Sequence, residues 1–295
     1  MPVNVKLLSK YLANRLQDVL PTIVHSDQKG FVKGRSLHHH VRLLDDLQHH
    51  ATINNSASLA IFLDFEKAYD RVVWDYLFLV LAKLGFGIYF ISMIHLLYNK
   101  SLARLMLNGY LLRPLETTRG VKQVDPLSSL LFLLCIEPLG NLVRSRKDLG
   151  ILLTEPIQVT GLYFADDSTL ISGNISGIRQ QLEIVDIYCQ GSGARLNLRK
   201  SALMPLNRHL RCPDVAEVRC MQPNDTIKYL GIPFGQHITP ELILGELNAK
   251  FFRGFGREEH ERFVADPFTQ SFFQCCGISL RIPQFRMITY KGGNK

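Results

Sequence analysis

Residues 159–172 read Val-Thr-Gly-Leu-Tyr-Phe-Ala-Asp-Asp-Ser-Thr-Leu-Ile-Ser, an acidic dipeptide set between two apolar runs. The runs predict two strands, Val159 to Phe164 and Ser168 to Ser172. Ala165-Asp166-Asp167 lies between them, so we predict a tight turn that carries two carboxylates.

A second buried strand ends in another acid. Residues 57–65 form an apolar run too brief for a core helix, which predicts a buried strand, and Asp64 lies near its end. Asp45-Asp46 repeats the acidic dipeptide, but it lies in a polar helical pattern where we expect a solvated helix face. The setting therefore distinguishes Asp64 and Asp166-Asp167 from the other acids.

Placing carboxylates close together costs free energy, which indicates that such a cluster binds a cation. Like charges raise each other's pKa and desolvation adds to the effect, so such a cluster persists mainly where a cation neutralises it. Hard oxygen ligands suit Mg²⁺, and two such ions stabilise the attacking and leaving oxygens of an in-line phosphoryl displacement. Nucleotidyl transfer fits this pattern. Acids that cap helices at turns, and a metal-dependent nuclease, are the alternatives.

The composition is that of a folded protein with a basic surface. The chain has 295 residues, 46% hydrophobic and 20% charged, which is enough to bury a sizeable core. Lys and Arg outnumber Asp and Glu by 34 to 26, and the net charge of +8 favours a polyanionic partner.

Other sequence features bear on location. The six cysteines show neither CxxC nor zinc-ligand spacing, which argues against a disulfide framework. The sequence contains no secretory pattern and no apolar run of about 18 residues. We therefore expect an intracellular protein without membrane contact, and the sequence leaves a nuclear or a cytoplasmic location open.

Helical and strand patterns alternate along the chain. Leucines at every fourth position predict an amphipathic helix over 3–20, ended by Pro21. Asn108-Gly109 predicts a type I′ turn in a hairpin over 103–115. After Phe252 neither period is steady. The remaining patterns predict helices at 41–47, 72–84, 88–98, 126–146 and 178–189, and strands at 196–203 and 227–232.

Several ordered motifs between about Lys6 and Gly235 carry a family resemblance. They are His25-Ser-Asp-Gln-Lys-Gly-Phe-Val-Lys-Gly-Arg-Ser36, Leu63-Asp-Phe-Glu-Lys-Ala-Tyr-Asp70, Gly120-Val-Lys-Gln-Val-Asp-Pro-Leu-Ser-Ser-Leu-Leu-Phe132, Phe164-Ala-Asp-Asp167, Gly193-Ala-Arg-Leu-Asn-Leu-Arg-Lys200 and Tyr229-Leu-Gly-Ile232. In this order they resemble the reverse transcriptase of LINE-type, non-LTR retrotransposons.

The resemblance implies an α/β (α+β) fold, a right-hand polymerase palm whose antiparallel sheet carries the aspartates, with fingers helices and a truncated thumb. We assign residues 1–55 to a partial fingers region. By the same resemblance, residues 56–235 would form the palm, with an inserted fingers hairpin at about 100–120, and residues 236–295 would form a thumb remnant or degenerate tail.

The resemblance also implies a metal site. Asp64 and Asp166 would ligate the metal ions, with Asp167 in support and the backbone carbonyl of Phe65 assisting. The cofactor would be Mg²⁺, with Mn²⁺ as a substitute. Lys200 is a candidate acid for the departing pyrophosphate, and an ordinary surface charge is its alternative reading.

Contacts to the incoming nucleotide follow from the same resemblance. Tyr69 matches the position where a flat ring beneath the sugar would clash with a 2′-hydroxyl, which favours deoxynucleotides. Lys33 and Arg35 are phosphate candidates, with a solvated basic loop as the equally weighted alternative. Gln123 belongs to the motif that packs against the nascent base pair.

These motifs imply an RNA-directed DNA polymerase that adds dNTPs to a primer 3′-hydroxyl. Its partners would be an RNA template and a DNA primer, or an RNA–DNA duplex, held mainly through the backbone. Tyr229, Leu230 and Gly231 would grip the primer end. We expect the upstream endonuclease domain common in the family to be absent from this chain, as in a fragment.

Two positions depart from the family's pattern. Val124 replaces the usual Gly after the Gln, and Ser129 replaces the usual Pro after the first Ser. Val does not readily adopt positive φ and adds bulk, so Val124 bears on activity more than on fold. A catalytically decayed copy that at most binds nucleic acid is therefore the alternative function. A metal-dependent nuclease ranks third, because it leaves Tyr69 and Gln123 unexplained.

Overall fold

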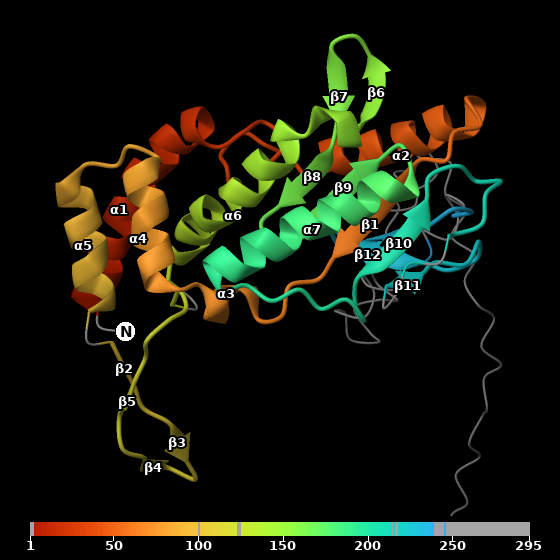
Figure 1. The fold of residues 1–295 in the computed structure, drawn as a ribbon. Coiled ribbons are helices and arrows are strands. Elements are labelled where there is room, and N and C mark those ends of the chain that lie inside the picture. Colours follow the sequence, from red (N-terminus) through yellow and green to blue (C-terminus); the bar gives the residue numbers. More distant parts are fainter. Residues whose placement is uncertain are drawn as a thin grey trace, which may run out of the picture. The chain divides into compact units, whose positions relative to one another are not determined.

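A five-stranded sheet in the order β11-β10-β1-β9-β8 forms the centre of the computed structural model (Figure 1). β1 is antiparallel to both of its neighbours, and β8 and β9 form an antiparallel hairpin. β10 and β11 are parallel. The strands are β1 (Leu59–Leu63), β8 (Gly161–Phe164), β9 (Asp167–Ser172), β10 (Ala202–Pro205) and β11 (Arg219–Cys220).

The structure describes residues 3–99, 101–122, 125–213, 215, 218–238 and 245. The first of two compact units runs from Met1 to Ile238. Gln123, Val124 and nearly all of the predicted thumb remnant at 236–295 lie outside the described residues. The division of the first unit into fingers and palm stays a prediction. None of the described helices is both long and apolar enough to cross a membrane.

Helices lie on both sides of the sheet. They are α1 (Val3–Ile23), α2 (His38–Ile53), α3 (Ala68–Arg71), α4 (Trp74–Lys83), α5 (Ile88–Tyr98), α6 (Ser128–Ser145), α7 (Ile175–Ser192) and the 3-10 helix η1 (Lys147–Leu149). The prediction that Pro21 ends the first helix was wrong. Proline removes only its own N–H donor, and the Val24 amide still bonds to the Leu20 carbonyl at 2.9 Å, so α1 continues to Ile23.

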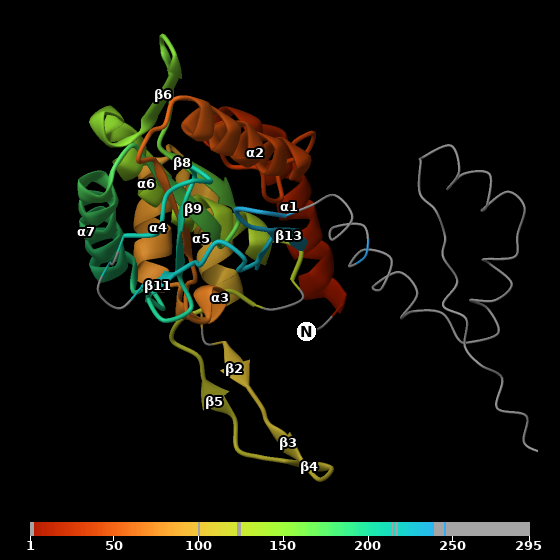
Figure 2. The same cartoon turned by 90° about the vertical axis from the view of Figure 1, so that its right-hand side faces the viewer.

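β1 is buried on both faces, which explains why its sequence is an unbroken apolar run. Leu59, Ile61 and Leu63 belong to one hydrophobic cluster, together with residues of α6 and α7. Ala60 belongs to a second cluster, together with Leu44 of α2. Figure 2 shows α6 and α7 on one side of the sheet and α2 on the other. The alternation along the strand therefore divides the core into two layers.

The strand predicted at 196–203 was wrong in its extent, because β10 begins only at Ala202. Asn197 turns the chain first: its carbonyl accepts hydrogen bonds from the amides of Lys200 at 3.1 Å and Ser201 at 2.9 Å. Asparagine favours such turns. The turn leaves the Asn197 amide free to bond to the Asp64 carbonyl at 2.8 Å, beside the end of β1.

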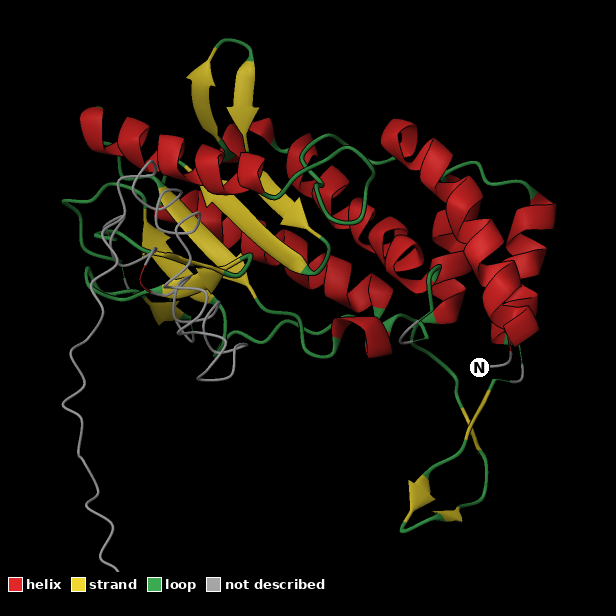
Figure 3. Cartoon of the chain, turned by 180° about the vertical axis from the view of Figure 1, so that it is seen from behind, coloured by secondary structure: helices red, strands yellow, loops and turns green. Residues whose placement is uncertain are grey.

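In the described residues, four two-stranded sheets accompany the central sheet, and two of them form a single hairpin (Figure 3). In the predicted hairpin, Leu107 pairs with Tyr110, and Asn108 and Gly109 have φ of 49° and 82°, the positive values that a type I′ turn requires. One hairpin contains two of these pairs: β2 (Leu102–Ala103) with β5 (Leu115–Glu116), and β3 (Met106–Leu107) with β4 (Tyr110–Leu111). The other two pairs are β6 (Ile151–Thr154) with β7 (Ile157–Val159), and β12 (Ile227–Tyr229) with β13 (Ile232–Phe234).

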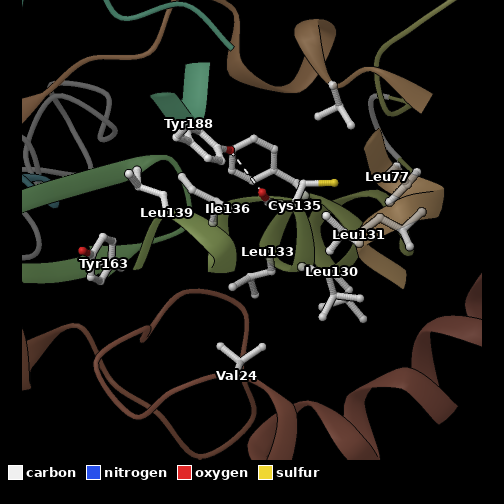
Figure 4. Packing of buried hydrophobic residues seen from close by; sticks show 14 of the residues in the cluster. Val24, Leu77, Leu130, Leu131, Leu133, Cys135, Ile136, Leu139, Tyr163 and Tyr188 are labelled. Carbon is white, nitrogen blue, oxygen red and sulfur yellow. Dashed lines mark hydrogen bonds between the residues drawn. The ribbon is translucent and has the colours of Figure 1, made fainter. Parts of the chain in front are cut away.

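One carbonyl ties three helices together. The hydroxyls of Tyr76 in α4 and Tyr188 in α7 donate to the backbone oxygen of Cys135 in α6, at 3.0 and 3.1 Å. Figure 4 shows the Tyr188 bond and the buried residues around it. The bonds satisfy one buried and one partly buried hydroxyl that would otherwise cost free energy, so α6 is fixed against both neighbours.

A charge network fixes α6 to the loop that follows α1. Arg144 forms two hydrogen bonds to the Asp27 carboxylate, at 2.7 and 2.8 Å, and an ion pair with Glu137. The Glu137 side chain is 3% exposed, and its burial raises the pKa of its carboxyl, although the Arg144 charge acts in the opposite direction. Arg144 is thus the shared partner of two acids.

Replacing Arg144 with Met should lower the free energy of unfolding by about 3–5 kcal/mol, because two partly or fully buried carboxylates lose their partner. The urea midpoint, followed by circular dichroism, measures the effect. Arg146→Met is the matched control, since its ion pair with Asp148 is exposed and should leave the midpoint nearly unchanged. Equal shifts in the two variants would contradict the role of Arg144.

Candidate active site

The register of two strands brings distant acids to one edge of the sheet. β1 and β9 are antiparallel with Leu63 opposite Ser168, so Asp64 follows the end of one strand where Asp167 begins the other. Asp64 is held on its backbone by Asn197 and by the hydroxyl of Ser201, which accepts from the Asp64 amide at 3.2 Å. Asp64 and Asp167 line the same cavity.

Asp166 lies in the turn between β8 and β9. Phe164 pairs with Asp167, which leaves Ala165 and Asp166 as a two-residue turn. Ala165 has a φ of 55°, uncommon for a residue with a Cβ, and is 3% exposed. The predicted acidic turn is confirmed, with the strand boundary at Asp167 rather than at Ser168.

The three aspartates interact electrostatically. Partial desolvation, and then the negative charges of Asp166 and Asp64, raise the pKa of the Asp167 carboxyl. Within the described part of the chain, no three His, Cys, Asp or Glu side chains form a group able to hold a metal ion. A metal ion at this edge would need further ligands, and Mg²⁺ commonly combines one or two carboxylates with waters and substrate phosphates.

The cavity beside the acids has a volume of about 320 Å³, near the lower end of the roughly 300–1,000 Å³ of ligand pockets. Lys200 and Tyr229, both predicted as site residues, line it together with Asp64 and Asp167. Arg219 and Lys228 also line it, and sequence reasoning missed both. No sequence signal identified them, because the pairing of β10 with β11 and the placement of β12 bring them there.

Of the three predicted primer-contacting residues, Tyr229 lines the cavity, and Leu230 and Gly231 lie in a turn. The Tyr229 ring packs against Phe62 of β1, with ring centroids 5.4 Å apart. Leu230 and Gly231 form the turn between β12 and β13, with φ of 49° and 86°. Tyr229 therefore connects the sheet to this ribbon, and a primer contact for the three residues stays a prediction.

Tyr69 lies close enough to Asp166 for the charge of that acid to affect its hydroxyl. Burial, and then the charge of Asp166, raise the pKa of the Tyr69 hydroxyl to about 12. Its ring stacks on Phe132 of α6, with centroids 4.5 Å apart and planes 14° apart. The stack fixes the plane of the Tyr69 ring on the Asp166 side of the site.

The two predicted phosphate contacts differ in their surroundings. Lys33 is exposed. The Arg35 guanidinium donates to four backbone carbonyls, those of Pro21 at 3.2 Å, Val24 at 2.9 Å, His25 at 2.6 Å and Gln28 at 2.7 Å. Four of its five donors are thereby used, which favours a structural role for Arg35. Phosphate binding by either residue stays a prediction.

The remaining predicted positions lie at the end of β1 and on two helices, and Gln123 and Val124 lie outside the described residues. Phe65 forms an antiparallel bridge with Leu196, directly after Asp64. Ser129 is half-buried in the first turn of α6. Asp45 and Asp46 are exposed on α2, which confirms the solvated helix face predicted for that dipeptide.

Comparisons with known proteins agree with this architecture. A family model described as reverse transcriptase (RNA-dependent DNA polymerase) matches residues 1–234. The "Transposon TX1 uncharacterized 149 kDa protein" of Xenopus laevis is 34% identical over 203 residues, 68% of this chain and 15% of the relative. The "Retrovirus-related Pol polyprotein from type-1 retrotransposable element R2" of Nasonia vitripennis is 24% identical over 80% of this chain and 24% of its own length.

Solved structures show the same fold at low sequence identity. Apo telomerase from Candida tropicalis is similar with a TM-score of 0.55 and 11% identity, over 78% of this chain and 39% of that chain. Telomerase from the same organism in complex with a fragment of telomeric RNA has a TM-score of 0.54 and 11% identity, over 76% and 36%.

The fold prediction is confirmed as a right-hand polymerase fold of mixed α/β type. The chain spans 15% and 24% of the lengths of the two curated relatives, which are proteins of LINE-type elements. The family match over residues 1–234, together with these relatives, shows that the chain belongs to the reverse transcriptases, the RNA-dependent DNA polymerases.

Proposed function

We propose that this chain adds deoxynucleotides to a primer 3′-hydroxyl, directed by an RNA template, through two-metal nucleotidyl transfer. One observation carries the proposal: Asp64 and Asp167 line one cavity with Lys200, while Asp166 lies in the adjoining turn. The family relationship supports the reaction class. Because the chain spans a small part of its relatives, the activity of a whole protein of this kind is also a proposal.

Asp64, Asp166 and Asp167 would hold the metal ions, with the Phe65 carbonyl assisting. Mg²⁺, or Mn²⁺ in its place, would supply charge stabilisation for the attacking and leaving oxygens. The raised pKa of Asp167 supports the assignment: desolvation raises it first, and the negative charges of Asp166 and Asp64 add to the effect, and a cation would offset that charge. The ε-ammonium of Lys200 would donate a proton to the departing pyrophosphate from the rim of the same cavity.

Tyr69 would select the sugar. Its stack on Phe132 prevents the ring from rotating away, so a 2′-hydroxyl above it meets a fixed surface. Gln123 would contact the nascent base pair, Lys33 and Arg35 the phosphates, and Tyr229 the primer end.

The proposed partners are an RNA template, a DNA primer and dNTPs, and the proposed location is intracellular, where these substrates occur. The telomerase neighbour with telomeric RNA supports an RNA partner by fold alone. Positive residues on the cavity rim, Arg219 and Lys228, support a polyanionic ligand.

A decayed copy that binds nucleic acid without incorporating nucleotides is the second candidate, and Val124 and Ser129 favour it. Ser129 lies within the described residues, in the first turn of α6, which also contributes Phe132. A nuclease remains third, because it gives no role to the stacked Tyr69.

Asp166→Ala should reduce primer extension on an RNA template with Mg²⁺ by at least about a thousandfold, because losing a metal ligand removes several kcal/mol of charge stabilisation. Asp46→Ala is the matched control, from the same dipeptide on the exposed face of α2, and should leave extension unchanged. If the wild-type chain is silent, Val124→Gly should restore extension. Duplex binding without incorporation in every variant would support the decayed copy instead.

Tyr69→Ala should raise the ratio of rNTP to dNTP incorporation, measured as kcat/KM, by about 10- to 200-fold, the range for one small group excluded from a pocket. Removing the ring removes the surface that excludes the 2′-hydroxyl. Tyr69→Phe keeps the ring on Phe132 and should keep the discrimination. An unchanged ratio in Tyr69→Ala would refute sugar selection by this residue.

Carboxyl ¹³C NMR should place the pKa of Asp167 above 3.8, and Asp166→Asn should move it back toward 3.8 by removing one negative neighbour. The folded pKa exceeds the unfolded one, so the metal-free chain should lose stability as the pH rises through this window. Mg²⁺ should offset that loss above the window. If the pKa of Asp167 does not change in Asp166→Asn, the two carboxylates do not interact electrostatically and the prediction is wrong.

A further inference from the structure

The loop between α1 and α2 runs along the outer strand of the sheet and reaches the acidic turn. The Lys29 amide donates to the Tyr163 carbonyl at 2.8 Å, and the Tyr163 amide donates to the Asp27 carbonyl at 3.2 Å. Gln28 forms a parallel bridge with Tyr163 of β8. The loop therefore pairs with the strand that leads directly into Ala165 and Asp166.

Gln28 contacts the turn itself. Its side-chain oxygen, Oε1, accepts the amide of Gly30 at 2.9 Å and the amide of Ala165 at 2.9 Å. Gln28 is 1% exposed, so water does not compete for these bonds. One buried oxygen thus joins the loop to the residue that precedes Asp166 and has the positive φ of the turn.

Gly30 explains how the loop comes so close. A Cβ on Gly30 would lie 2.5 Å from the Ala165 nitrogen, much shorter than any normal carbon contact. The loop backbone therefore lies directly against the turn, and any side chain at position 30 would push the two apart. The close approach of Gly30 and the Gln28 hydrogen bond therefore act on the same residue of the turn, Ala165.

The loop is itself held from both sides. Arg144 of α6 bonds to the Asp27 carboxylate, and Arg35 donates to the carbonyls of His25 and Gln28. One guanidinium therefore binds the side chain of the preceding residue, Asp27, and the other binds the backbone carbonyl of Gln28 itself. The backbone that carries the Gln28 side chain is therefore anchored to α6 and to Arg35.

We propose that Gln28 is a positioning residue for Asp166: its amide oxygen fixes the Ala165 amide and thereby holds the β8–β9 turn, so that the Asp166 carboxylate keeps its place beside Asp64 and Asp167. The proposal rests on the proposed polymerase function for its catalytic consequence. Its structural claim, that Gln28 holds the Ala165 amide, concerns one hydrogen bond and can be tested without measuring enzyme activity.

The first test measures the Ala165 amide directly. Gln28→Met keeps the length of the side chain but removes the acceptor, so hydrogen exchange at the Ala165 amide, followed by NMR, should accelerate by roughly tenfold or more. Gln28→Glu retains carboxyl oxygens as acceptors and should restore protection. Unchanged exchange in Gln28→Met would overturn the proposal.

Gln181→Met is the matched control. Gln181 is also fully buried, and its amide donates to the carbonyls of Thr160 at 3.3 Å and Ile171 at 3.0 Å, at the opposite end of the same hairpin. Its loss should destabilise the fold without exposing the Ala165 amide. Equal acceleration in Gln181→Met and Gln28→Met would indicate general loosening of the hairpin and would overturn the proposal.

The second test measures the consequence for chemistry. Gln28→Met and Gly30→Ala should lower kcat for nucleotide addition by about 10- to 100-fold, the range for a small misplacement of a reacting group, while the KM for dNTP and the affinity for duplex change less than about twofold. An active wild-type chain with an unchanged kcat in Gln28→Met would overturn positioning and leave the polymerase function standing. A wild-type chain without activity would instead count against the proposed function, and the exchange measurement would still decide the role of Gln28.

Discussion

The antiparallel pairing of β1 with β9 is the constraint on which the candidate site depends. Leu63 lies opposite Ser168, so the acid after β1 and the acid that begins β9 emerge at the same edge of the sheet. A shift of one residue in this register would exchange the faces of every side chain on the strand and expose part of the core. The burial that stabilises β1 on both faces therefore also fixes the distance between the carboxylates.

Placing these acids together lowers the stability of the fold, and contacts to the neighbouring backbone hold the acids in place. Asp167 is pushed toward its protonated form by desolvation and by two like charges. The neighbouring backbone is correspondingly well anchored: Asn197 and Ser201 hold Asp64, and Gln28 holds Ala165. Rigid support of this kind preserves a geometry that electrostatic repulsion alone would loosen.

Basic residues in this chain serve two different purposes. Arg144 and Arg35 use their guanidinium donors inside the protein, on carboxylates and on backbone carbonyls. Lys200, Arg219 and Lys228 instead line an open cavity beside the acids, where Arg219 also pairs with Asp225 at 3.3 Å. The net positive charge of the sequence does not separate these groups, because charge counts carry no information on which donors are already bonded. Arg35, which the motif predicts as a phosphate contact, is one example: its guanidinium already donates to four backbone carbonyls.

The sequence by itself determined the parts of this protein that depend on near neighbours in the chain: the apolar run of β1, the acidic turn at Ala165-Asp166, the Asn108-Gly109 hairpin and the family motifs. Periodicity and turn preferences are local, so they are visible in a short window. Only the tertiary structure decided that Gln28 bonds to Ala165, that Tyr69 stacks on Phe132, and that Arg219 and Lys228 join Asp64 and Asp167 around one cavity. These contacts join segments far apart in the chain, and they follow from sheet register and helix packing, which no local pattern encodes.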